Sequence, residues 1–161
     1  MAVAVGPGDQ MPEVAGPTQA GTRLSTRQFL GKWLVLYFYP KDNTPGCTRE
    51  AKAFDAILEA LRARDAEVVG VSVDSAASHR HFADACGLRF PLISDHDRSI
   101  SRRLDVLNER GTSARRTTFL IDPEGRVAHV FDSVKVDGHA EEVLRTLDRL
   151  REARGQAVRK E

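Results

Sequence analysis

Hydrophobic residues along this chain follow two patterns, short uninterrupted runs and longer segments with a helical repeat. Residues 33–39 are apolar at every position, which is typical of a central strand covered on both faces. Further along, apolar residues at spacings of three and four predict a helix over residues 47–64. A second strand is expected at residues 67–73 and a second helix at residues 75–86. The first half of the chain therefore predicts alternating strands and helices.

The order of elements changes toward the C-terminus. A strand, a helix, two strands and a final amphipathic helix are expected, in that order, at residues 90–93, 99–107, 117–121, 126–131 and 139–152. The Asp-Pro-Glu-Gly sequence at residues 122–125 is a turn signature and predicts an antiparallel hairpin. This order predicts an α/β fold with a central mixed β-sheet and helices on both faces, which is the layout of a thioredoxin-like fold.

The chain of 161 residues is expected to form one domain over residues 1–153, because no repeat, low-complexity segment or linker divides it. Residues 6–24 are rich in glycine, proline and threonine and predict an irregular hairpin. Ser25 is placed to cap a short helix through Phe29. The polar residues 154–161 predict a flexible C-terminal tail.

Composition and charge exclude some classes of partner. The chain is 41% hydrophobic and 29% charged, and its formal net charge is +1, which gives no electrostatic basis for binding nucleic acid or an anionic membrane. The apolar run at residues 33–39 is much shorter than the roughly 20 residues that cross a bilayer. We expect a monomer or a weak homodimer.

The two cysteines are too few for a disulfide scaffold, and the first residues lack the basic segment of a signal peptide. A reducing, cytoplasmic location is therefore expected. In that compartment a cysteine is a packing residue, a metal ligand or a reactive thiol, and its neighbours indicate which.

The strongest chemical signal is the spacing Pro40-x-x-x-Thr44-x-x-Cys47, directly after the central strand and at the start of a helix. The thiolate is the nucleophilic form of cysteine, and a thiol with a pKa of about 8.5 is only about 3% thiolate at pH 7. The unpaired N–H groups and positive dipole end of a helix N-terminus both favour the anion. The pattern therefore favours a reactive Cys47 over a small buried packing residue.

The neighbours of Cys47 suit this chemistry. Pro45 fits the first helical position, and Gly46 leaves room for a substrate near the backbone. The Thr44 hydroxyl is placed to bond a substrate atom near the sulfur, although the same residue type also serves as a plain helix cap. Pro40 would shield the thiolate from water.

Residues 37–51, Tyr-Phe-Tyr-Pro-Lys-Asp-Asn-Thr-Pro-Gly-Cys-Thr-Arg-Glu-Ala, resemble the active-site segment of peroxiredoxins, most closely the peroxiredoxin Q or bacterioferritin-comigratory-protein subfamily. Further matches follow in order at residues 72–75, 78–79, 90–95, 116–122 and Gly125, so the resemblance covers roughly residues 6–150. It implies an antioxidant thiol peroxidase that reduces hydrogen peroxide and organic hydroperoxides without metal, haem or flavin.

The resemblance also implies roles for individual residues. Cys47 would be the peroxidatic cysteine, oxidised to a sulfenic acid, and Arg116 the arginine of the active site, with Thr44 and Pro40 completing the pocket. A guanidinium beside the sulfur favours the thiolate and can bind the peroxide oxygens. Glu50 would by itself disfavour the thiolate, so it is assigned a supporting role, paired with an arginine.

The chain departs from the subfamily at the second cysteine. The subfamily often places a resolving cysteine five residues after the first, where this chain has Lys52, or in the following helix at the position of Ala83. This chain has Cys86 instead. Cys86 is either a displaced resolving cysteine, with thioredoxin as reductant, or a packing residue in a one-cysteine enzyme that uses a small thiol.

Other functions fit less well. A dithiol oxidoreductase needs Cys-x-x-Cys, and the residue three after Cys47 is Glu50. A non-enzymatic thioredoxin-like binding module or holdase remains the alternative, and it would not need Thr44, Cys47 and Arg116 together. The histidines show no metal-type spacing and are expected at the surface, at His79, His81, His96, His129 and His139.

Overall fold

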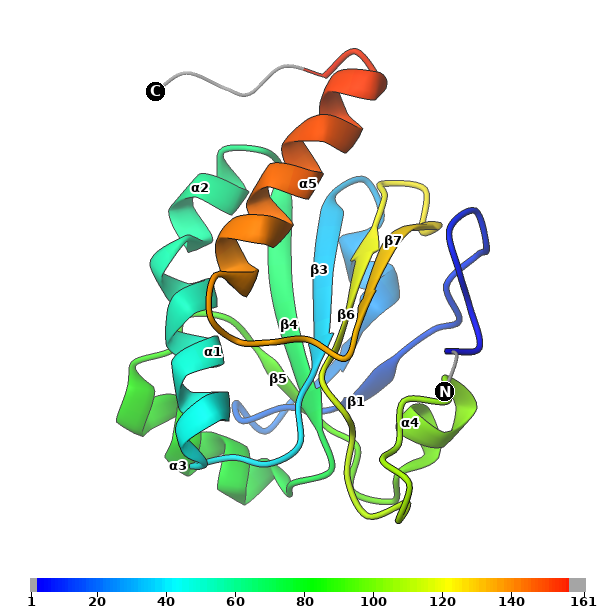
Figure 1. Ribbon diagram of the computed structural model, residues 1–161. Helices are drawn as coiled ribbons and strands as arrows, with labels where there is room; N and C mark the ends of the chain where they lie inside the picture. The colour runs from blue at the N-terminus through cyan, green and yellow to red at the C-terminus, as the bar shows by residue number, and fades with distance from the viewer. Residues whose placement is uncertain (1–2, 157–161) are drawn as a thin grey trace.

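A five-stranded sheet with the strand order β5-β4-β3-β6-β7 organises the protein, as the computed structural model of residues 3–156 shows (Figure 1). The strands are β1 (Ala15–Pro17), β2 (Arg23–Ser25), β3 (Trp33–Phe38), β4 (Ala66–Ser72), β5 (Leu92–Ser94), β6 (Thr117–Ile121) and β7 (Val127–Asp132). The helices are η1 (Thr26–Phe29), α1 (Pro45–Ala56), α2 (Leu58–Arg62), α3 (Ala76–Cys86), α4 (Ser99–Arg103) and α5 (His139–Ala153).

The central strand β3 is buried at all six positions, as its continuous apolar sequence predicts. It pairs in parallel with β4 and antiparallel with β6, so the sheet is mixed. In this register Phe38 lies opposite Val71 on one side and opposite Thr117 on the other. The C-terminal end of β3 and the N-terminal end of β6 therefore meet at the same edge of the sheet.

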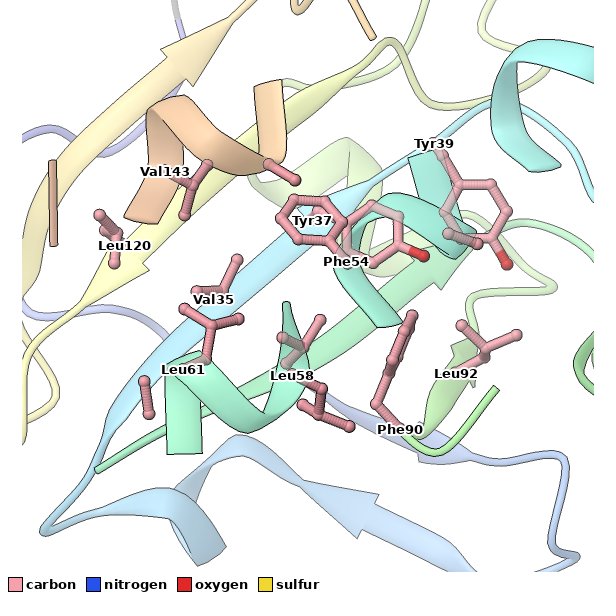
Figure 2. Packing of buried hydrophobic residues seen from close by; sticks show 14 of the residues in the cluster. Val35, Tyr37, Tyr39, Phe54, Leu58, Leu61, Phe90, Leu92, Leu120 and Val143 are labelled. Carbon is pink, nitrogen blue, oxygen red and sulfur yellow. The ribbon is translucent and has the colours of Figure 1, made fainter. Parts of the chain in front are cut away.

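Side chains of β3 alternate between two hydrophobic clusters, one on each face of the sheet. Val35 and Tyr37 pack with Phe54 of α1 and with residues of α2, α3 and α5, and Figure 2 shows Tyr37 beside Phe54 in this cluster. Leu36 points to the opposite face and packs in the cluster that includes Ile100 of α4. Figure 1 likewise shows α1, α2 and α5 on one side of the sheet and α4 on the other. The predicted α/β class with helices on both faces is confirmed.

The single helix predicted over residues 47–64 is wrong in one respect, because the segment forms two helices. Ile57 leaves helical geometry at φ −101° and ψ 8°, and its N–H bonds the Phe54 carbonyl in a tight turn. The break between α1 and α2 leaves Phe54 and Leu58 both fully buried against the sheet. Tertiary packing thus decides a boundary that the apolar repeat does not mark.

The N-terminal segment forms the predicted hairpin, with β1 and β2 antiparallel. Ser25 caps the short helix η1 as expected, since its hydroxyl accepts from the Arg27 N–H while the Gln28 side chain accepts from the Ser25 N–H. The hairpin at β6 and β7 is also confirmed, with the Gly125 N–H bonded to the Asp122 carbonyl in the turn.

The end of α5 lies against Trp33 at the edge of the sheet opposite the β3–β6 meeting point. The Trp33 Nε1 donates to Gln156 Oε1 at 3.0 Å, and the Arg154 guanidinium stacks over the indole ring at 5.4 Å. The first residues of the predicted tail therefore make contacts, and residues 157–161 lie outside the described residues. Of the described helices, none is both long and apolar enough to cross a membrane.

Candidate active site

Cys47 lies in the first turn of α1, directly beyond the loop that leaves β3. Thr44 is the residue before the helix, Pro45 opens it, and the first helical hydrogen bond runs from the Thr48 N–H to the Thr44 carbonyl at 2.9 Å. The cysteine is only 1% exposed, so its sulfur is shielded from bulk water, at a helix end whose free N–H groups favour an anion. This is the position that the sequence motif predicts.

Arg116, the residue directly before β6, reaches the same point. Its Nη2 lies 3.2 Å from Cys47 Sγ, although the two residues are 69 positions apart in the chain. A cation in contact with sulfur stabilises the thiolate, and the remaining N–H groups of the guanidinium can donate to an oxygen bound there. The adjacent Arg115 is used differently, in an ion pair with Asp132.

Gly46 leaves space for the Arg116 side chain beside Cys47. A Cβ at this position would lie 2.7 Å from Arg116 Nη2, closer than side chains tolerate. Room at residue 46 was expected to serve the substrate, and in the structure it accommodates the guanidinium as well. A larger residue here would push the guanidinium away from its position beside Cys47.

Glu50 completes the cluster from the next turn of α1. Its Oε1 accepts from Arg116 Nη1 at 2.7 Å, so the predicted pairing with an arginine is present. Glu50 is 2% exposed, and its Oε2 has no hydrogen-bond partner among the described residues. Burial raises the pKa of Glu50 to about 7, and the Arg116 charge opposes that rise. The carboxyl therefore changes charge near neutral pH.

The Tyr37 ring lies in the same buried region. Burial, reinforced by the nearby charges of Glu50 and Cys47, raises the pKa of Tyr37 well above its usual value. The phenol thus stays neutral and forms an uncharged wall beside the two acidic groups.

Thr44 and Pro40 belong to the loop between β3 and α1. The Thr44 hydroxyl donates to the Lys41 carbonyl at 2.9 Å, which leaves its oxygen lone pairs for another donor. Both residues are half-buried. Asn43 adopts a left-handed conformation at φ 63°, which turns the chain into the helix. Both motif residues therefore lie in the loop that leads into the first turn of α1, where Cys47 lies.

Cys86 lies in the last turn of α3 and is a free thiol, half-buried against the cluster that contains Cys47. Burial raises the pKa of Cys86, and the Lys52 charge partly offsets this. The buried residues of α3 are His79, Phe82 and Ala83, and Cys86 continues their spacing of three and four. Cys86 is thus on the inward stripe of the helix, one turn beyond Ala83.

The prediction that all five histidines lie at the surface is wrong for two of them. His79 is fully buried and His139 is 3% exposed. His79 Nδ1 lies 2.8 Å from Asp42 Oδ2, and His139 Nε2 lies 2.9 Å from the Thr118 hydroxyl. Burial lowers the pKa of His139. The signal for His79 was its place on the stripe of Phe82, three residues later.

Asp42, Asp74 and His79 bring three potential metal ligands within 4.8 Å of one another. Their carboxylates are engaged by protein donors, because Asp42 accepts from Tyr39 and Ser78, and Asp74 Oδ2 accepts from the Ser72 hydroxyl and the Asp42 N–H. Protein donors therefore account for this cluster as an internal hydrogen-bond network.

Comparison with known proteins agrees with this geometry. Residues 7–130 match the AhpC/TSA family. Peroxiredoxin Bcp of Xanthomonas campestris pv. campestris is 44% identical over 133 residues, which cover 79% of this chain and 83% of that protein.

Two solved structures extend the similarity to the fold. Structures of X. campestris bacterioferritin comigratory protein, described as trapped intermediate and ligand complexes that bear on its alkyl peroxide reduction activity, match with a TM-score of 0.82 and 39% identity over 93% of this chain and 99% of that one. Peroxidoxin BcpB of Mycobacterium tuberculosis matches with a TM-score of 0.84 and 32% identity over 91% and 99% of the two chains. The chain therefore belongs to the AhpC/TSA family as a peroxiredoxin of the Q or bacterioferritin-comigratory-protein type, a thiol peroxidase with a thioredoxin-like fold.

Proposed function

We propose that Cys47 is the peroxidatic cysteine of this enzyme and that Arg116 assists it. The observation that carries the proposal is the 3.2 Å contact between Arg116 Nη2 and Cys47 Sγ at the N-terminus of α1. A helix N-terminus and a guanidinium both stabilise an anion at this sulfur. Thr44 and Pro40, in the loop before α1, are assigned to orienting the peroxide and excluding water.

In the proposed reaction the Cys47 thiolate attacks the terminal oxygen of the hydroperoxide. An S–O bond forms as the O–O bond breaks, the sulfur is oxidised by two electrons, and the alkoxide or hydroxide takes up a proton and leaves as alcohol or water. Arg116 can donate to the oxygens as negative charge moves onto the leaving one. The product at Cys47 is a sulfenic acid.

Hydrogen peroxide and organic hydroperoxides are the proposed substrates, and antioxidant defence is the proposed role. The alkyl peroxide reduction ascribed to the X. campestris relative supports the organic substrates. The absence of any cofactor in this reaction stays a prediction from the family resemblance, and the cytoplasmic location and the monomer or weak homodimer stay expectations from the sequence.

Cys86 is proposed as the resolving cysteine. Its thiol would attack the Cys47 sulfenic acid, forming a disulfide and releasing water, and thioredoxin would then reduce that disulfide. Because Cys47 is in a buried first turn, α1 would unwind locally to bring the Cα atoms within about 7 Å. In the alternative, Cys86 only packs, and a small thiol reduces Cys47 directly.

The first test is the intact mass of the reduced protein after one equivalent of hydrogen peroxide, without reductant. A loss of about 2 Da supports resolution by Cys86, and a gain of about 16 or 32 Da supports a one-cysteine enzyme. No change within minutes would contradict peroxidase chemistry at Cys47 and favour the binding-module alternative.

Substitutions test the roles proposed for Cys47 and Arg116. Cys47→Ser should abolish peroxide turnover, and Arg116→Ala should slow it by about a hundredfold or more, as removal of a charge-stabilising donor commonly does. Arg115→Ala is the matched control, since Arg115 pairs with Asp132 and should leave turnover within about twofold. Normal turnover in Cys47→Ser would overturn the assignment.

A further inference from the structure

A buried hydrogen-bond network centred on Asp42 lies in the loop between β3 and α1. Asp42 is 4% exposed, and its Oδ1 accepts from the Tyr39 hydroxyl at 2.6 Å. Its Oδ2 accepts from the Ser78 hydroxyl at 2.8 Å and lies 2.8 Å from His79 Nδ1. A loop carboxylate enclosed in this way is costly to desolvate, so its partners must hold it in place.

His79 connects this carboxylate to the sheet. Its ring is fully buried, and Nε2 lies 3.0 Å from the Ile93 carbonyl oxygen in β5. A carbonyl only accepts, so Nε2 carries a hydrogen and donates it. Nδ1 lies 2.8 Å from Asp42 Oδ2, within hydrogen-bond distance. The ring is therefore held at both ends, by a rigid strand and by the loop.

The loop backbone is fixed at the same residue. The Asp42 N–H donates to Asp74 Oδ2 at 2.9 Å, and the Ser72 hydroxyl donates to that oxygen at 2.6 Å. Asn43 follows in its left-handed conformation. Both the main chain and the side chain of the loop are thus anchored two residues after Pro40 and two residues before Thr44.

We propose that His79 is a positioning residue for peroxide reduction. By holding Asp42, it fixes the loop so that Pro40 and Thr44 stay in register with the Cys47 sulfur. This inference rests on the proposed function, because it assigns His79 a task only if the loop residues orient a peroxide. It explains why a polar ring is buried on the inner stripe of α3, where an apolar residue would satisfy packing alone.

Two reactions of the Cys47 sulfur, oxidation by a peroxide and alkylation, should depend differently on the loop. Attack on a peroxide requires alignment with the O–O bond and with the donors around it, and small misplacements of positioning groups are known to cost up to about a hundredfold in rate. Alkylation by iodoacetamide also requires access to the buried thiolate, but it needs no alignment with an O–O bond and its donors. A variant at His79 should therefore affect the first reaction far more than the second.

The experiment compares His79→Gln with His81→Gln, the same substitution at an exposed position of the same helix. The single-turnover rate of Cys47 oxidation by peroxide and its alkylation rate by iodoacetamide are measured for both, with thermal melting as a check on folding. His79→Gln should slow oxidation about tenfold or more while alkylation stays within about threefold. Proton NMR should also show a protected, downfield ring N–H signal that His79→Gln lacks and His81→Gln keeps.

Equal oxidation rates in the two glutamine variants would overturn the proposal, as would a parallel fall in oxidation and alkylation in a folded His79→Gln protein. If His79→Gln does not fold, Asp42→Asn keeps the size of the loop side chain and should give the same selective loss. Cys47→Ser distinguishes a failure of the proposed function from a failure of the positioning role of His79. Turnover in that variant would refute the proposed function, whereas an inactive Cys47→Ser with a normal His79→Gln refutes only the positioning role.

Discussion

Two residues of the active site, Cys47 and Glu50, share the guanidinium of Arg116. Arg116 contacts Cys47 through Nη2 and Glu50 through Nη1, at 3.2 Å and 2.7 Å. Glu50 thereby orients the guanidinium but also competes with the sulfur for its positive charge. How strongly Arg116 stabilises a Cys47 thiolate therefore depends on the position of its guanidinium and on the charge of Glu50. Each of these can be changed separately by a substitution.

Gly46→Ala changes the position of Arg116. The new Cβ would meet Nη2 at 2.7 Å, so the flexible guanidinium must shift away from Cys47. Alanine favours helix by up to about 1 kcal/mol over glycine, so stability should stay level or rise while peroxide oxidation of Cys47 slows about tenfold or more. Stopped-flow oxidation and urea unfolding measure the two effects.

The control for this variant is Gly6→Ala, because no atom lies within 4 Å of a Cβ at residue 6. Its oxidation rate should match the natural protein. An unchanged rate in Gly46→Ala would show that the contact between Arg116 and Cys47 does not limit the reaction.

Glu50→Gln removes a titrating group. The pKa of Glu50 is raised by burial from 4.5 to about 7, so the unfolded chain ionises first and the natural protein loses stability as pH rises through that window. The loss should amount to about 3 kcal/mol and be complete above pH 7. The unfolding free energy of Glu50→Gln, relative to the natural protein, should rise by that amount between pH 4.5 and 7. Urea titrations at a series of pH values test this, and a constant difference would contradict it.

At the scale of elements, the helices on the α1 side of the sheet combine packing with chemistry. α1 carries Cys47 and Glu50 on its buried face, and α3 carries His79 and Cys86 on its inward stripe. α5 contributes packing, with Val143 buried in the same cluster. The reactive residues are thus held by the hydrophobic cluster that stabilises the fold.

Leu147→Ala tests the packing role of α5. Leu147 is fully buried, so its truncation should cost about 3 kcal/mol, within the range of buried leucine substitutions. Leu150→Ala, one turn later in the same helix, removes a side chain that is only partly buried and should cost clearly less. Urea unfolding of both variants measures the difference, and equal losses would contradict the assignment of faces.

At the scale of the whole molecule, one end of the sheet carries the active site and the other end is stabilised by contacts with α5. One end gathers the active site, because β3 ends and β6 begins there. The other end is closed by contacts between Trp33, the end of α5 and the β6–β7 turn, where Arg154 pairs with Asp122 and contacts Glu124. The C-terminus of α5 therefore contributes to the stability of the sheet at a distance from the chemistry.

Trp33 reports on this closed end, because it is the single tryptophan and is 1% exposed. Gln156→Ala removes the acceptor of its indole N–H, so emission should shift to the red and stability should fall by about 1 kcal/mol. Glu152→Ala, at an exposed position of the last turn of α5, is the control and should leave emission unchanged. Identical spectra for both variants would contradict the role of Gln156.

Several features followed from local sequence. The all-apolar β3, the Ser25 capping box and the hairpin turn at Gly125 were all predictable, because near neighbours in the chain decide them. The break at Ile57 and the burial of His79 were not, because each depends on what the segment packs against.

The sequence by itself determined the α/β order of elements and the motif that places Cys47 at a helix N-terminus, since hydrophobic periodicity and helix-start signals act over a few residues. The family resemblance pointed to Arg116, but only the tertiary structure showed how it meets Cys47, through the register of β3 and β6, and that Gly46 leaves the space for it. It likewise decided that His79 supports Asp42 across two elements. The physical reason is that such contacts join segments tens of residues apart, and their distances exist only once the sheet has formed.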